Sequence, residues 1–170
     1  MELATLRDDV VFKVGRNVLL FQELERTLKW ITPRLNISGN TPTEMSLSFQ
    51  KRKDSASKRT LGMNAGELLN SGESVTPSHR LSFATSMALA PATRAEIEKL
   101  IEDRNQLIHH FFDGVDPESC ESWQTAAKRL DSQRDRLVEV TRLMRDMAEG
   151  MSEGHKFLIQ ETVDDLENKT

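Results

Sequence analysis

The chain has 170 residues, a formal net charge of −4, 37% hydrophobic residues and 29% charged residues. A chain of this length can bury a sizeable core, so we expect residues 1–170 to form a single domain. The acidic balance excludes a protein that coats nucleic acid non-specifically, although it leaves room for a local basic surface. Tyrosine is absent and β-branched runs are scarce, so the composition favours an all-α fold over one with sheets.

The amino terminus has no signal-peptide pattern, and no apolar run approaches ~18 residues, so we expect a cytoplasmic protein with no membrane partner. Cys120 is the only cysteine, which excludes an internal disulfide and a cysteine-based metal cage. The sequence has no glycine-rich phosphate loop, zinc-binding His-Glu-x-x-His helix or nucleophile elbow. We therefore expect no metal and no cofactor.

A first amphipathic helix is predicted from about Asp8 to Leu35, with Pro33 near its end. Glu25 and Lys29 stand four apart on it, with the glutamate first, which is the order that favours a surface ion pair. A functional role for this pair is the alternative. The predicted buried residues are Val11, Phe12, Val14, Val18, Leu20, Phe21, Leu24, Leu28 and Ile31.

Residues 36–91 are predicted to be a variable, largely polar connection that contains short helices. It begins with a loop near 36–42 and continues with a weak helix over 43–59, whose basic run suits either a solvated helix face or an RNA-facing patch. The basic residues of this run are Lys51, Arg52, Lys53, Lys58 and Arg59.

A turn and short helix follow from Thr60 to Leu69, and residues 71–78 read as a flexible connection. The alternating segment 81–89 is expected to be an ordered loop, because a lone strand would have no partner.

The next helix is predicted over 93–112, with Thr93 and Glu96 forming a capping box at its start. Asp116-Pro117 would begin a long helix over 117–149 that returns antiparallel after a short turn. Glycines should interrupt that helix, which leaves 150–170 as a flexible C-terminal segment containing a short helix.

Three polar residues interrupt the apolar pattern of the helix over 93–112: Arg104, Asn105 and His109. At ~100° per residue, Asn105 and His109 project from the same side, and the long arm of Arg104 can reach around to them. Arginine supplies a fixed positive charge and histidine a group that titrates near neutrality, a plausible combination for chemistry on a phosphodiester. The apolar residues of this helix, all expected to be buried, are Ile97, Leu100, Ile101, Leu107, Ile108 and Phe111.

The segment Arg104-Asn105-Gln106-Leu107-Ile108-His109 resembles the R-N-x-x-x-H signature of the HEPN superfamily. The stretch from Gly15 to Glu25, the Thr60-Leu61-Gly62 segment and the Asp116-Pro117 helix start also look like features of that superfamily. The resemblance implies an up-down bundle of four to five helices, with a long polar loop region between helices 1 and 3. It covers most of the chain as an architecture, but only the motif is specific.

The resemblance also implies a metal-independent endoribonuclease that acts as a toxin or in antiviral defence. In such an enzyme the motif helices of two copies meet in a homodimer. His109 would serve as acid or base, Asn105 would orient its ring, and Arg104 would hold the scissile phosphate. Cleavage by the RNA 2′-hydroxyl would leave a 2′,3′-cyclic phosphate and a 5′-hydroxyl. RNA, a second copy and an antitoxin or other partner protein are the implied partners.

Phe111 occupies the position where HEPN toxins commonly carry a tyrosine that an antitoxin adenylylates, so that form of control is not expected here. His110 is an additional ring beside the motif and is expected to be spare rather than catalytic. The alternative is a purely structural role, in which Arg104 pairs with Glu102, Asp103 or another surface acid and His109, at the helix end, bonds a carbonyl.

Two other functions are compatible with the sequence. One is a non-catalytic dimerisation or adaptor domain, whose long fourth helix recognises a partner protein. The other is a nucleotide sensor that uses Arg104 and the basic run. If the protein is an enzyme, we expect the side chains of Arg104 and His109 to open into a cleft shared by two copies. If it is an adaptor, we expect these side chains to find their bonding partners within one copy or to be exposed to solvent.

Overall fold

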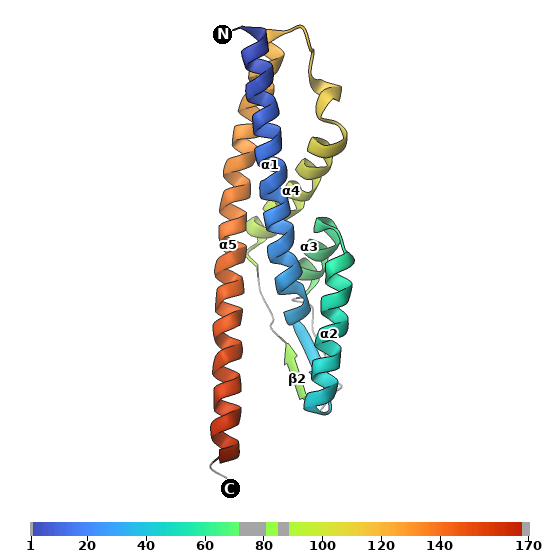
Figure 1. Ribbon diagram of the computed structural model, residues 1–170, viewed down its shortest axis with the longest axis vertical. Helices are drawn as coiled ribbons and strands as arrows, with labels where there is room; N and C mark the ends of the chain where they lie inside the picture. Colours follow the sequence, from blue (N-terminus) through green and yellow to red (C-terminus); the bar gives the residue numbers. More distant parts are fainter. Residues whose placement is uncertain (1, 72–80, 85–88, 168–170) are drawn as a thin grey trace.

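The computed structural model describes residues 2–71, 81–84 and 89–167, without the side chains of 81–84, 155 and 157–167. These residues form a helical bundle with one small sheet, which confirms the predicted all-α fold (Figure 1). In chain order, the elements are α1 (Leu3–Ile31), the 3₁₀ turn η1 (Thr32–Arg34), β1 (Asn36–Gly39), α2 (Pro42–Lys58), α3 (Leu61–Asn70), β2 (Leu81–Ala84), α4 (Pro91–His109), the 3₁₀ turn η2 (Phe111–Gly114) and α5 (Cys120–Glu167).

The long helices α1 and α5 lie side by side and run in the same direction, while α4 runs in the opposite direction against them (Figure 1). The predicted antiparallel return of the last helix along α4 is therefore confirmed. Helices α2 and α3 pack beside the C-terminal half of α1, and α5 continues beyond the end of α1. No helix in the described ranges has an apolar stretch long enough to cross a membrane.

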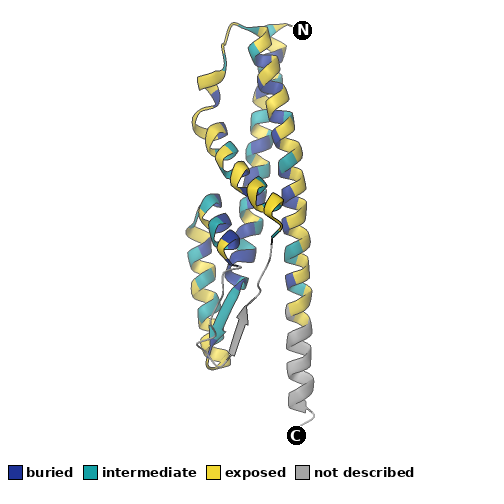
Figure 2. Cartoon of the chain, turned by 180° about the vertical axis from the view of Figure 1, so that it is seen from behind, coloured by how far each residue is buried: buried dark blue, intermediate teal, exposed yellow. Residues whose placement is uncertain are grey.

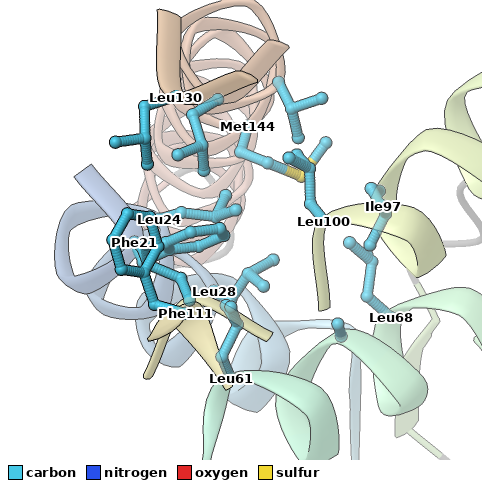
Figure 3. Packing of buried hydrophobic residues seen from close by; sticks show 14 of the residues in the cluster. Phe21, Leu24, Leu28, Leu61, Leu68, Ile97, Leu100, Phe111, Leu130 and Met144 are labelled. Atoms are coloured by element: carbon cyan, nitrogen blue, oxygen red, sulfur yellow. The ribbon is translucent and has the colours of Figure 1, made fainter. Parts of the chain in front are cut away.

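The core forms where α1, α3, α4 and α5 meet (Figure 3). Burying these side chains stabilises the fold by roughly 25 cal/mol for each Å² of apolar surface removed from water. The labelled core residues in Figure 3 are Phe21, Leu24, Leu28, Leu61, Leu68, Ile97, Leu100, Phe111, Leu130 and Met144.

The predicted buried face of α1 is partly wrong. Val11 and Phe12 are 63% and 69% exposed, whereas Leu6 and Val10 are buried. The helix begins at Leu3 rather than near Asp8, which adds a turn of core contacts at its N-terminus. The error arises because the buried face includes the polar Asn17, so apolar character alone does not locate it.

Asn17 is fully buried and links α1 to α5. Its side-chain N–H groups donate to the Leu130 carbonyl and to Gln133 Oε1, each at 2.8 Å. Gln133 in turn donates to the Asp103 carbonyl of α4 at 3.4 Å. Because buried polar groups are costly when unpaired, this chain of hydrogen bonds favours one register of the three helices over its alternatives.

The structure corrects the loop predicted near 36–42 and the first part, 81–84, of the ordered loop predicted over 81–89, of which 85–88 lie outside the described residues. Residues 36–39 form β1 and pair antiparallel with β2, with Ile37 opposite Phe83. The segment Leu81–Ala84 has a strand partner after all, because β1 pairs with it from far away in the sequence. The predicted connection over 71–78 lies outside the described residues, apart from Ser71.

Gly39 ends β1 where the chain turns into α2. A Cβ atom there would lie 2.6 Å from the Met45 backbone nitrogen, so only glycine allows this close approach. Helix α2 begins one residue earlier than predicted, with the Thr41 side chain accepting the Glu44 backbone N–H at 3.2 Å. That hydrogen bond satisfies a free N–H group at the helix start.

The capping box predicted at Thr93 is not formed. Helix α4 begins at Pro91, with Ala90 as its N-cap and no side-chain cap. Proline suits this first helical position because its missing N–H would lack a partner in any case. The Glu96 carboxylate instead accepts a hydrogen bond from Arg136 on α5 at 3.2 Å.

Helix α5 begins at Cys120, three residues after Pro117, and the Ser119 hydroxyl accepts the Ser122 backbone N–H at 3.2 Å. The predicted break at Gly150 is wrong, because α5 is one helix from Cys120 to Glu167. Each glycine costs a helix about 1 kcal/mol relative to alanine, which the surrounding helix-forming residues can offset.

Candidate active site on the motif helix

Helix α4 directs most of its apolar residues inward, and two of its three motif residues are exposed to solvent. Ile97, Leu100 and Leu107 are buried, and Phe111 of η2 extends the same buried face. Arg104 is half-buried at the edge of this face, while Asn105 and His109 are exposed. The motif therefore lies on the surface of the bundle rather than inside it, although the apolar pattern of this helix had suggested that its polar residues interrupt a buried face.

Arg104 has no ion pair in the described part of the chain. Its Nη1 donates to Asn105 Oδ1 at 3.3 Å, a contact with a neutral group. The adjacent acid, Asp103, lies instead on the α5 side of the helix, where its Oδ2 accepts from Arg136 Nη2 at 2.6 Å. The predicted alternative, in which Arg104 pairs with Glu102 or Asp103, is not what the structure contains.

His109 forms no hydrogen bond within the described ranges, either to a carbonyl or to Asn105. Its exposed ring lies 6.3 Å from the ring of His110, measured between centroids. His110 follows the end of α4, and its Nδ1 lies 3.0 Å from Asp113 Oδ2. The structure thus gives His110 a local partner and leaves His109 open to solvent.

Apolar side chains flank the motif on its outward side. Ile108 is 44% exposed and Phe112 is 69% exposed, so the prediction that Ile108 is buried is wrong. They are close to His109 in the chain, Ile108 at the C-terminal end of α4 and Phe112 in η2. The single chain therefore presents polar motif residues and uncovered apolar surface on one region of α4.

A cavity of about 190 Å³ lies between α4 and α5. The three motif residues are not among its lining residues, so the single chain does not enclose the motif in this pocket. The described residues also contain no group of three His, Cys, Asp or Glu side chains arranged to hold a metal ion. The cavity is lined by Asp103, Gln106, Leu107, Arg129, Leu130, Gln133 and Arg136.

The basic run on α2 is divided between internal contacts and solvent. Arg52 and Arg59 both pair with Glu67 of α3, and Arg52 also donates to the Thr32 carbonyl at 3.1 Å. These two arginines therefore fasten α2 to its neighbours. The exposed cations of the run are Lys51, Lys53 and Lys58.

Glu25 and Lys29 form the ion pair predicted from their spacing, with 2.7 Å between Oε1 and Nζ. Within the described residues, neither of them forms a hydrogen bond or ion pair with Arg104, Asn105 or His109.

The sequence-based prediction missed the role of Arg136. This residue bridges Glu96 and Asp103, which stand seven apart and so share one face of α4. The seven-residue spacing of the two acids was a signal available in the sequence, but the arginine that joins them comes from a distant helix.

Comparisons with protein-family models, curated proteins and solved structures found no match to this chain. The similarity to the HEPN superfamily thus depends on the motif and on its position in a helical bundle.

Proposed function

We propose that this protein is a metal-independent endoribonuclease of the HEPN type. The observation that carries the proposal is that Arg104 has no ion-pair partner among the residues that the structure describes. The neighbouring carboxylate of Asp103 is held by Arg136, and the hydrogen bond that Arg104 donates goes to the neutral Asn105. A guanidinium without a counter-ion remains available to an RNA phosphate, which it can bind through two parallel hydrogen bonds.

The reaction needs two proton transfers, one from the attacking 2′-hydroxyl and one to the departing 5′-oxygen. The RNA 2′-oxygen attacks the phosphorus, the bond from phosphorus to the 5′-oxygen breaks, and a cyclic phosphate forms. His109 of one copy takes the proton of the 2′-hydroxyl, and the partner's His109 gives a proton to the departing 5′-oxygen. Arg104 stabilises the negative charge that grows on the phosphate.

This mechanism requires two copies, and the surface beside the motif supports such a pairing. Ile108 and Phe112 are uncovered next to His109, and large apolar side chains of this kind are favoured at the centre of protein interfaces. A homodimer that buries them would bring the two motif helices together and enclose the exposed histidines in a drier cleft. Toxin activity or antiviral defence is the biological role that such an enzyme would serve.

The second candidate is an adaptor without catalytic activity. It is favoured by the same exposed apolar residues and by the length of α5, which continues beyond the bundle (Figure 1). In that case the surface around Ile108 would bind a partner protein, and Arg104 and His109 would serve only as polar contacts at its rim.

RNA cleavage by purified protein distinguishes the two functions. The wild-type protein is expected to cut a mixed RNA substrate in a buffer containing a chelator, and the His109→Ala and Arg104→Ala variants are expected to be inactive. His110→Ala is the matched control, because it removes the neighbouring ring without touching the motif, and it should cut like wild type. Intact RNA with all four proteins, or equal cleavage by the motif variants, would reject the enzyme.

A further inference from the structure

Helix α1 carries an exposed apolar stripe on the side that faces away from the core. Val11, Phe12 and Leu19 are 63%, 69% and 66% exposed. Gly15 lies between them, four residues from both Val11 and Leu19, so the stripe follows one helical ridge. Large apolar residues concentrated on one face of a helix indicate a surface that binds another protein.

Gly15 has no role within the single chain that explains its presence. It lies in the middle of a 29-residue helix, where glycine is less favourable than alanine. Its φ is not positive, and a Cβ atom built on it would meet nothing within 4 Å in the described part of the chain. A glycine at the centre of an exposed apolar ridge lets a second helix approach closely.

Charged residues at the two ends of the stripe indicate the identity of that second helix. Asp8 and Arg26 are both exposed, and neither has an ion-pair partner in the described part of the chain. They lie five helical turns apart and therefore point in the same direction as each other. That direction is within about 20° of the direction of Gly15, so both residues lie on the face of the stripe. One end of the surface is thus acidic and the other is basic.

We propose that the α1 stripe binds the α1 stripe of a second copy of this chain, in an antiparallel arrangement centred on Gly15. Around that centre Val11 of one copy faces Leu19 of the other, and the same contact repeats by symmetry. Asp8 then lies about 6 Å along the axis from Arg26 of the other copy, within reach of the arginine side chain. A parallel pairing would instead place like charges together.

This surface differs from the motif region on α4. Helix α1 lies in front of α4 in Figure 1, and the order is reversed in the rear view of Figure 2. The stripe points away from the core, to which α4 contributes Leu100 and Leu107. Pairing through α1 therefore leaves the α4 surface free, and the two interfaces together would build a species larger than a dimer.

The first test is the mass of the full chain in solution, measured by light scattering over a range of concentrations. Wild type should be at least dimeric, and Leu19→Asp should lower the mass while circular dichroism shows an unchanged helix content. Leu47→Asp is the matched control, because Leu47 is 57% exposed on α2 and lies outside the stripe, so it should leave the mass unchanged. A wild-type monomer, or an equal effect of both variants, would overturn the proposal.

Two further measurements test the geometry. Asp8→Arg and Arg26→Asp should each weaken self-association, and the double variant should restore it, because the charges then meet again with reversed sign. Residues on a two-fold axis meet their own copies, so Gly15→Cys combined with Cys120→Ser should form a disulfide-linked dimer on mild oxidation. Leu47→Cys in the same background should not. Failure of the charge reversal to restore association, or of the Gly15 variant to cross-link, would overturn the antiparallel pairing.

These outcomes are independent of RNA cleavage. Phe112→Asp would disrupt a dimer built through α4 and leave α1 cross-linking intact. The proposed ribonuclease and the α1 interface can therefore fail separately.

Discussion

Arg136 Nη2 lies 2.6 Å from Asp103 Oδ2, so an arginine of α5 holds the acid that immediately precedes Arg104. The contact has two effects. It fastens α4 to α5 in a defined register, and it keeps the Asp103 carboxylate on the side of α4 away from the motif. The separation of the Arg104 guanidinium from the neighbouring carboxylate thus depends on Arg136, a residue that the motif does not include.

This relationship predicts the behaviour of variants at Arg136. Arg136→Ala frees Asp103 to pair with Arg104, so RNA cleavage should fall even though the motif is intact. Asp103→Asn alone should cut like wild type, and the double variant should recover most of the activity lost in Arg136→Ala. Loss of activity in all three variants would mean that the ion pair acts only through the fold. Both side chains are 25% exposed, and partly exposed pairs are worth about 0–1 kcal/mol, so the loss of stability should be small.

Asn17 should be among the residues whose substitution most destabilises the fold. Asn17→Ala leaves the buried Gln133 side chain without its donor and opens space in the α1–α5 interface. An unsatisfied buried polar group costs about 1–3 kcal/mol, and urea unfolding should show a loss of this size. Gln22→Ala, an exposed position on the same helix, is the control and should change the free energy of unfolding very little. Equal stability of the two variants would contradict the role assigned to the buried network.

The ion pair between Lys13 and Asp131 should make stability depend on pH at both extremes. The hydrogen bond from Lys13 lowers the pKa of Asp131 below its ordinary value of 3.8, and the same bond raises the pKa of Lys13 above 10.5. The stabilising effect of Asp131 is therefore complete above pH 3.8 and is lost as the pH falls through its lower folded pKa. The effect of Lys13 is complete below pH 10.5 and is lost as the pH rises through its higher folded pKa.

Asp131→Asn should accordingly flatten the acid limb of the stability profile and reduce the alkaline limb in part, because Asp9 also pairs with Lys13 and raises its pKa. Thermal unfolding across the pH range, compared with Asp135→Asn at an exposed position on the same helix, measures the effect. An Asp131→Asn profile that runs parallel to wild type would contradict the predicted linkage.

Replacing Gly150 and Gly39 by alanine should change the free energy of unfolding in opposite directions. Gly150→Ala should stabilise the protein by about 0.5–1 kcal/mol, because the position is helical and open, and alanine restricts the unfolded chain more than glycine does. Gly39→Ala should be destabilising, because its Cβ atom would press on the backbone at the start of α2. Denaturant unfolding of both variants provides the comparison, and a stabilising Gly39→Ala would show that the turn relaxes freely.

The sequence predicted features that depend on local spacing. The three-and-four pattern of Ile97, Leu100 and Leu107 located the buried face of α4, and the short turn before α5 predicted its antiparallel return. The pairing of Glu25 with Lys29 followed from the same kind of rule.

The features that the sequence did not predict depend on contacts between distant segments. Pairing of β1 with β2 requires residues near 36 and 84 to meet, and no local pattern identifies that partner. The contact between Asp103 and Arg136 is of the same kind. Apolar periodicity also misplaced Val11 and Phe12, because a buried polar residue, Asn17, forms part of the true core face.

The chemical ends of the RNA products test the central claim most directly. Chelator-treated wild-type protein should produce fragments that carry a 2′,3′-cyclic phosphate and a 5′-hydroxyl, and His109→Ala should produce none. Labelling by a polynucleotide kinase without prior phosphatase treatment detects the 5′-hydroxyl. Fragments with 5′-phosphate and 3′-hydroxyl ends, cleavage that stops with the chelator, or no cleavage at all would contradict attack by the RNA 2′-hydroxyl at a site formed by Arg104 and His109.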